Sequence, residues 1–198
     1  MAEPDAITPK DRAAWRRWLA RHHRRPDGVW VVLAKKGVNG LHVDEAVEEA
    51  LCVGWIDSTA GRVDDERFRV WFAPRKRGSV WSAINKERVE RLIAAGRMTS
   101  AGLEKIERAK VDGSWDALND ADALRESPDL AAALDADAVA RRHWDAFPPS
   151  ARKQILAWIG AAKRPQTRAS RIERTVRLAA ENIRANQPGA GPSARPSR

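Results

Sequence analysis

Trp55-Ile-Asp-Ser-Thr-Ala-Gly-Arg-Val-Asp-Asp-Glu-Arg-Phe-Arg-Val-Trp-Phe72 decides the fold class of the first part of this chain. Two alternating segments, 55–63 and 67–72, flank the acidic turn 64–66 and predict a β-hairpin. Side chains of the second segment divide between two faces, with Phe68, Val70 and Phe72 on one and Arg67, Arg69 and Trp71 on the other. We therefore expect one face of the hairpin in the core and the other in water.

Signals on both sides of the hairpin extend it to an α+β module. Residues 29–34 are β-branched and aromatic enough for a buried strand. Thr8, followed by Pro9, predicts the start of a helix that continues to about His22. Further helices are expected from Asp44 to Gly54, from Ser79 or Ser82 to Gly96, and from Thr99 or Ser100 to Gly113. The predicted fold is a small antiparallel sheet of three or more strands packed with helices.

The second part of the chain predicts a helical unit. Three helices are expected over about 138–147, 150–162 and 167–184. The predicted organisation is an α+β module over 1–115, an acidic connector over 116–137 with one helix near its end, a helical C-terminal unit over 138–185, and a disordered tail over 186–198. The tail is expected because it is rich in Gly, Pro and Ser.

Composition indicates a globular protein of the cytoplasm. The hydrophobic fraction of 43% is ordinary for a folded domain. Residues 1–25 carry many charges and no apolar core, and no stretch approaches the roughly 20 apolar residues of a membrane helix. The single cysteine excludes an internal disulfide. The four histidines have no metal-ligand spacing, and no cofactor is expected.

The net charge of +9 belongs to one part of the chain. Residues 1–149 contain 25 Lys and Arg against 25 Asp and Glu, whereas residues 150–198 contain 11 against 2. Four arginines at helical spacing carry much of this excess: Arg168, Arg171, Arg174 and Arg177. Such a row can bind nucleic acid through phosphates, although the acidic connector offers an internal partner instead.

The loop from Pro74 to Asn85 is the main candidate site. Arg75, Lys76 and Arg77 precede a helix start, where free backbone N–H groups favour an anion. The predicted ligand-binding set is Trp55, Asp57, Arg75, Lys76, Ser79, Trp81, Ser82 and Asn85. The partner would be an anionic small molecule or a protein group. The alternative is a capped helix after a solvated basic turn.

Two other features admit chemical interpretations. Arg67, Arg69 and Trp71, with Trp81 nearby in the chain, suggest a surface where a base or sugar stacks on indole while cations hold phosphates. The simpler alternative is packing of the tryptophans against helices. Cys52 lies in an apolar run near a helix end, which favours a buried structural thiol over a nucleophile.

Asp57 follows Trp55 on the predicted strand and can face the basic loop. A carboxylate beside arginine stays ionised, because the neighbouring positive charge favours its charged form. That state suits ion pairing or orientation of a ligand better than proton transfer at neutral pH. An enzyme of unknown reaction at a cleft between Asp57 and Arg75 is therefore the third interpretation.

Several motifs resemble the YdeI/OmpD-associated family. They are Ala50–Ser58, Pro74-Arg-Lys76, Ser79–Asn85, Glu90–Ile93, Gly96-Arg-Met98 and Ala162–Arg168 with Arg171-Ile172. The resemblance covers nearly the whole chain except the tail. It implies a link to bacteriocin protection or envelope stress, and it supplies no catalytic residues. The first hypothesis is therefore a binding or interaction protein, and the alternative is a nucleic-acid-binding module that uses the C-terminal arginines.

Overall fold

The computed structural model describes residues 6–186 of the chain. It divides into two compact units, Met1–Trp115 and Asp116–Arg198. The disordered tail expected over 186–198 lies, apart from Asn186, outside the described residues. No helix among residues 6–186 is long and apolar enough to cross a membrane.

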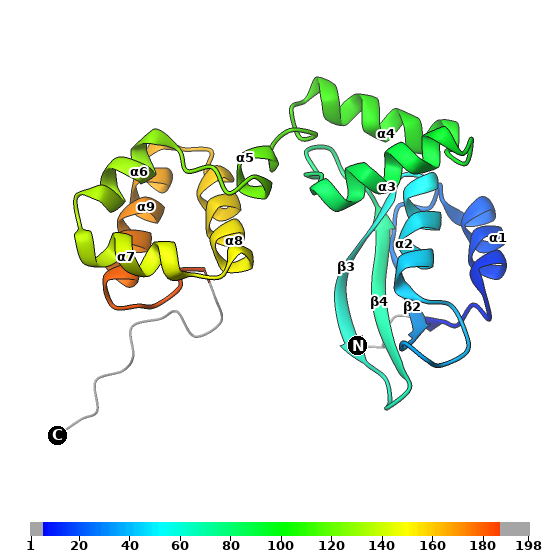
Figure 1. The fold of residues 1–198 in the computed structure, drawn as a ribbon. Coiled ribbons are helices and arrows are strands. Elements are labelled where there is room, and N and C mark those ends of the chain that lie inside the picture. Colours follow the sequence, from blue (N-terminus) through cyan, green and yellow to red (C-terminus); the bar gives the residue numbers. More distant parts are fainter. Residues whose placement is uncertain (1–5, 187–198) are drawn as a thin grey trace. The chain divides into compact units, whose positions relative to one another are not determined.

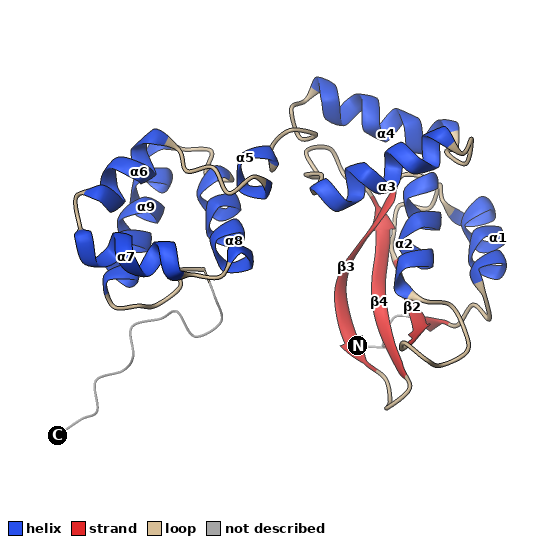
Figure 2. Ribbon diagram, in the orientation of Figure 1, coloured by secondary structure: helices blue, strands red, loops and turns tan. Residues whose placement is uncertain are grey.

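The N-terminal unit contains a four-stranded mixed sheet, with α1 (Arg12–His22) and α2 (Val43–Cys52) on one side of it (Figure 2). Its strands are β1 (Ala6–Ile7), β2 (Val29–Ala34), β3 (Trp55–Arg62) and β4 (Arg67–Pro74), in the order β1-β2-β4-β3. The predicted hairpin is β3 and β4, which pair antiparallel with an irregularity between Asp57 and Ala60. β4 also pairs antiparallel with β2, whereas β1 runs parallel to β2. The parallel strand is an addition to the expected antiparallel sheet.

Four helices complete this unit: α1 (Arg12–His22), α2 (Val43–Cys52), α3 (Ala83–Ala94) and α4 (Ser100–Val111). α1 begins later than expected, because the carboxylate of Asp11, and not Thr8, caps it by accepting from the N–H of Ala14 at 2.7 Å. Ser82 caps α3 and Thr99 caps α4. Each is one of the two alternative helix starts predicted from the sequence. The α+β class is confirmed.

The core of the N-terminal unit joins α1 and α2 to the inner face of the sheet. α1 and α2 pack side by side (Figure 1). Four of the largest core side chains are fully buried: Trp15, Leu19, Trp55 and Phe72. The indole N–H of Trp15 donates to the carbonyl oxygen of Ala46 at 3.0 Å, which satisfies its polar atom inside this core.

A buried carboxylate lies between α1 and the segment after α3. Glu49 of α2 is 2% exposed and accepts hydrogen bonds from Arg12, Arg16 and Arg97. Burial by itself raises the pKa of Glu49, but the hydrogen bonds from Arg16 and Arg12 and the charge of Arg97 outweigh it, so the pKa lies below its ordinary value. These ion pairs tie α1, α2 and the residues before α4 together.

The C-terminal unit is helical. It contains α5 (Asn119–Asp122), α6 (Pro128–Asp135), α7 (Ala138–Ala146), α8 (Pro149–Gly160) and α9 (Pro165–Ala180). Its core includes Trp144, Ile155 and Ile159. The expectation of a connector over 116–137 differs from the structure, because Leu130 and Leu134 of α6 are fully buried in this same core. The acidic segment is thus part of the C-terminal unit.

Candidate functional site

Arg75, the first cation of the predicted loop, points into the protein. It is 3% exposed, its guanidinium lies 3.5 Å from the ring centre of Trp81, and its Nη1 donates to the carbonyl oxygen of Val80 at 3.1 Å. Its Nε and Nη2 have no hydrogen-bond partner among residues 6–186. Burial lowers the pKa of Arg75 to about 10, and the charge of Asp57 opposes this shift. Arg75 therefore remains charged at neutral pH.

The space around Arg75 is small. Arg75, Lys76, Ser79 and Trp81 line one hollow of about 10 Å³, together with residues of α4 and the turn after it. A hollow of this size holds about one water molecule. A phosphate or carboxylate group needs more room, so ligand binding at this loop stays a prediction that the hollow does not support.

The other predicted ligand-binding residues lie apart from this hollow. Ser82 accepts from the N–H of Asn85 at 3.4 Å as the cap of α3, and the side-chain oxygen of Asn85 accepts from Arg88 at 3.1 Å. Trp55 is fully buried and donates from its indole N–H to the carbonyl oxygen of His23 at 2.9 Å. Asp57 lies on β3, where its charge acts on Arg75. The structure thus brings together four of the eight predicted residues.

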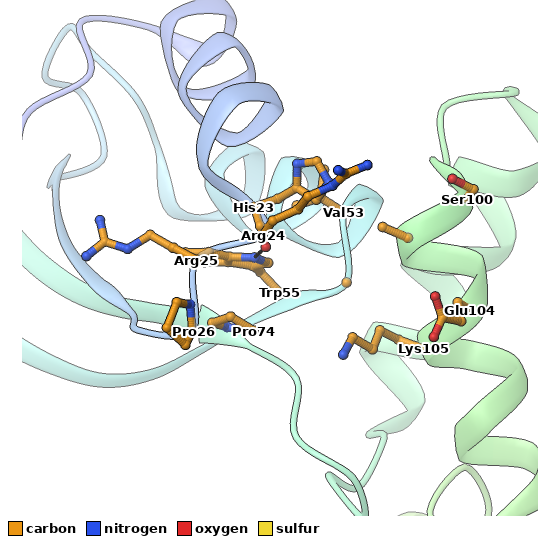
Figure 3. Close-up of a pocket in the computed structure, with 12 residues that line it drawn as sticks. His23, Arg24, Arg25, Pro26, Val53, Trp55, Pro74, Ser100, Glu104 and Lys105 are labelled. Atoms are coloured by element: carbon orange, nitrogen blue, oxygen red, sulfur yellow. Dashed lines mark hydrogen bonds between the residues drawn. The ribbon is translucent and has the colours of Figure 1, made fainter.

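A larger cavity lies between the turn after α1 and the start of α4. Its volume is about 500 Å³. Its walls are the turn His23–Pro26 on one side and Ser100, Ala101, Glu104 and Lys105 on the other, with Trp55 and Pro74 between them. In Figure 3, Lys105 extends from α4 toward that turn. We call this space the cationic cavity.

Positive charge dominates the cationic cavity. Within the described part of the chain, no carboxylate lies at ion-pair distance from Arg24, Arg25 or Lys105. The one acid in the lining, Glu104, is paired with Arg108 at 2.5 Å. Ser100 and Ala101 are the first two residues of α4, where the helix dipole is positive. The cavity is therefore suited to an anion.

Local packing holds the two walls in place. The hydrogen bond from Trp55 to the carbonyl oxygen of His23 anchors the turn after α1. On the other side, Gly102 of α4 lies against the backbone of Cys52, and a Cβ at position 102 would meet its carbonyl carbon at 2.9 Å. Gly54 has φ of +78°, and a Cβ there would meet Lys105 Cγ at 2.6 Å. These glycines allow α4 to approach the end of α2.

A further cavity of about 390 Å³ adjoins the first through His23 and Val53. Cys52 lines it, with Glu49, Arg16 and Arg97. Burial and the charge of Glu49 raise the pKa of the Cys52 thiol, which disfavours the nucleophilic thiolate. No group of three or more His, Cys, Asp or Glu side chains in residues 6–186 is placed to hold a metal ion.

Cys52 should therefore resist alkylation in the folded protein. We expect iodoacetamide at neutral pH to leave Cys52 unmodified by mass spectrometry, because the thiol is buried and its pKa is raised. Modification should become complete in denaturant. Rapid alkylation under native conditions would instead indicate an accessible, activated thiol and restore the thiol-enzyme interpretation.

The C-terminal arginines are partly engaged within their own unit. Arg168 binds both carboxylate oxygens of Asp129, from Nε at 2.6 Å and Nη2 at 2.8 Å, and this holds the pKa of Asp129 well below its usual range. Arg171 donates to the carbonyl oxygen of Trp158, and its guanidinium lies over the Trp158 ring. Arg174 also has a partner. This arrangement supports a structural role for part of the row.

Sequence reasoning missed the cationic cavity. His22-His23-Arg24-Arg25 is a basic run at the end of α1, and it was the available signal. Lys105 gave no signal, because one lysine on an amphipathic helix is ordinary. Only the packing of α4 on the end of α2 places Lys105 opposite that run.

Two family models match the chain. Residues 7–105 match a domain of unknown function (DUF8412), and residues 124–182 match the family described as "Bacteriocin-protection, YdeI or OmpD-Associated". The second match confirms the resemblance drawn from the sequence motifs, over the C-terminal unit. Ala50–Ser58 and the cationic cavity fall within the first match. None of the curated proteins and none of the solved structures matches the chain.

Proposed function

We propose that this chain, which belongs to the DUF8412 family over residues 7–105, binds an anionic ligand in the cationic cavity of its N-terminal unit. Residues 124–182 match the family described as bacteriocin-protection, YdeI or OmpD-associated. The ligand presents a phosphate or carboxylate group to Arg24, Lys105 and the start of α4. Arg25 stands at the side of the cavity that faces away from α4 (Figure 3).

The observation that carries this proposal is the set of cations without carboxylate partners around a concave space. Exposed cations on a convex surface are solvated and attract an anion weakly, whereas low-dielectric walls focus the field of cations in a cavity. Arg24 and Lys105 come from opposite walls, so an anion between them receives hydrogen bonds from two directions. The backbone N–H groups at the start of α4 add a third direction.

Binding is better supported than catalysis. The cationic cavity has no cysteine in its lining, and the serine that lines it, Ser100, begins a helix. A nucleophile needs a base within hydrogen-bonding reach. Among the described residues that line this cavity, no hydroxyl is hydrogen-bonded to the His23 ring, whose Nδ1 faces the carbonyl oxygen of Leu19.

The C-terminal match supports a proposal for the biological setting. Its description reads "Bacteriocin-protection, YdeI or OmpD-Associated". We infer that the ligand is bound in a cytoplasmic response to antimicrobial peptides or envelope stress.

A double substitution tests the site. We expect inorganic phosphate to raise the melting temperature of the full chain beyond the effect of sodium chloride at equal ionic strength. Arg24→Gln with Lys105→Gln should weaken phosphate affinity at least about tenfold, because a hydrogen bond to a charged group contributes about 1.5–3 kcal/mol. Differential scanning calorimetry across a phosphate titration measures both.

Lys36→Gln is the matched control, since Lys36 is exposed in the turn after β2 and lines neither cavity wall. This variant should respond to phosphate as the wild type does. Equal phosphate stabilisation of the double variant and the wild type would place any anion site elsewhere and contradict the proposal.

A further inference from the structure

An aromatic cavity adjoins the cationic cavity. Its volume is about 260 Å³, and Arg25 lines both spaces. The remaining lining comes from α1, from the strands β1, β2 and β4, and from the residue before β2: Ile7, Trp18, His22, Gly28, Val29 and Trp71. Figure 3 shows the Arg25 side chain directed away from α4, which is the direction expected for a residue that separates two neighbouring spaces. We call this space of about 260 Å³ the aromatic cavity.

The aromatic rings of this cavity are held in fixed positions. Trp18 is stacked on Trp15 at 5.2 Å between ring centres and on His22 at 4.5 Å, both with an interplanar angle of 19°. Trp71 packs edge-on against Trp30 at 5.5 Å. Both Trp18 and Trp71 nevertheless remain partly exposed. Trp15 and His22 therefore occupy the faces of the Trp18 ring, and the Arg25 guanidinium lies 5.8 Å from its centre. The indole of this cavity on which a planar ligand can stack is Trp71, whose position needs no rearrangement.

Gly28 shows how closely Trp71 is seated. A Cβ at position 28 would lie 2.5 Å from Cε2 of the Trp71 indole and 2.6 Å from the carbonyl oxygen of Phe72. The backbone at position 28 therefore supports the indole directly. The φ of Gly28 is not one that requires glycine. The close approach of the Trp71 ring, which leaves no room for a Cβ, explains why glycine occupies this position.

These two cavities fit the two chemical parts of one ligand. Indole rings bind planar bases by stacking, and this preference tolerates every base because each has a π-face. Cations opposite a helix start bind phosphate. The two volumes together lie within the range of about 300 to 1,000 Å³ that is typical of small-molecule sites. A nucleoside phosphate has its base and phosphate separated by one sugar, and Arg25 lies where that junction would fall.

We propose that the ligand of the N-terminal unit is a free nucleoside phosphate, with its phosphate between Arg24 and Lys105 and its base stacked on Trp71 in the aromatic cavity. This inference rests on the proposed function, since it names the ligand class of the same cationic cavity. It also gives a role to Trp71, which the hairpin pattern placed on the solvent face of β4.

Paired ligands test this inference with the full chain. Isothermal titration calorimetry compares adenosine 5′-monophosphate with ribose 5-phosphate, which carries the same sugar and phosphate without the base. Base stacking on an aromatic side chain is expected to strengthen binding about tenfold to a hundredfold. Trp71→Ala should bring the affinity for adenosine 5′-monophosphate to that of ribose 5-phosphate, and leave the affinity for ribose 5-phosphate unchanged. Trp71→Phe should retain most of the difference.

Trp158→Ala is the matched control, because Trp158 is a partly exposed tryptophan of the C-terminal unit beneath Arg171. It should bind both ligands as the wild type does. Arg24→Gln should weaken both ligands equally. Thermal unfolding of each variant shows whether it is folded, and Trp71→Phe keeps the test open if Trp71→Ala does not fold.

The outcomes separate the two proposals. Equal affinities of the wild type for adenosine 5′-monophosphate and ribose 5-phosphate overturn the nucleotide inference and leave the anion site standing. Absence of binding by both ligands overturns the anion site as well. The third comparison is with a short single-stranded oligonucleotide. If it binds far more tightly than adenosine 5′-monophosphate, the natural ligand is a nucleic acid, and the assignment to a free nucleotide is overturned.

Discussion

Replacement of Glu49 by glutamine is expected to lower the free energy of unfolding of the N-terminal unit by about 3 kcal/mol. Glutamine keeps the volume of the side chain but removes the charge that faces Arg12, Arg16 and Arg97. Removal of one member of a buried ion pair leaves the others uncompensated. The three arginines retain partial contact with water, so the effect falls at the lower end of the range for buried pairs. Urea unfolding at neutral pH measures it.

Glu48→Gln is the control for this prediction. Glu48 is the neighbouring residue and also contacts Arg12, but its side chain is 23% exposed. Loss of the Glu48 charge should lower the free energy of unfolding by about 1 kcal/mol or less, as for other ion pairs near the surface. Equal losses of unfolding free energy from the two substitutions would show that burial does not set the contribution of Glu49 to stability.

The stability difference between the wild type and Glu49→Gln should depend on pH. The folded pKa of Glu49 lies below its value in the unfolded chain, which is about 4.3 for glutamate. A depressed pKa adds stability that is fully present above the unfolded value and is lost as pH falls through the folded one. The difference in stability between the wild type and Glu49→Gln should therefore be constant near neutrality and shrink in acid. A difference that grew in acid would contradict the depressed pKa.

Substitution of Gly102 by alanine is the second large effect that we expect. The added Cβ would meet the backbone of Cys52, with its carbonyl carbon at 2.9 Å, and Cε of Met98 at 2.8 Å. Met98 can move, but the backbone of α2 cannot move without disturbing the core. Overpacking of this kind costs about 1–3 kcal/mol, and it exceeds the gain of about 1 kcal/mol from alanine in a helix. Unfolding in urea should show a net loss of up to about 2 kcal/mol.

Ligand binding should fall together with stability in Gly102→Ala. α4 carries Lys105 and the helix start, so a shift of α4 separates them from the turn His23–Pro26. Gly160→Ala is the matched control, because Gly160 is also helical and a Cβ there meets nothing within 4 Å. That substitution should stabilise the C-terminal unit by up to about 1 kcal/mol. A gain in stability from Gly102→Ala would mean that α4 is not seated on Cys52.

Local signals were sufficient to predict most helices and strands. The alternation from Trp55 to Phe72 predicted β3 and β4, and the β-branched run 29–34 predicted β2 within the bounds that the structure has. β1 was missed because two residues, Ala6 and Ile7, are too few to show alternation. α6 was assigned to a connector because its acidic residues hid Leu130 and Leu134, whose burial depends on distant helices.

The site was harder to predict, because it is built from residues far apart in the chain. The sequence singled out the basic loop at Arg75, but charge in a sequence does not reveal which way a side chain points. Arg75 turns inward over Trp81, whereas Arg24 remains exposed. The opposition of Arg24 and Lys105 follows from the packing of α4, and no local pattern encodes it.

The two separate cores have a consequence for the evolution of this protein. In residues 6–186, the buried cluster around Trp15 and the cluster around Trp144 have no residue in common. A substitution that loosens one cluster leaves the packing of the other intact, so natural selection acts on two units that can vary at different rates. A gene rearrangement that joins either half to another reading frame would transfer a complete hydrophobic core. This modularity accords with the two family matches, each of which lies within one unit.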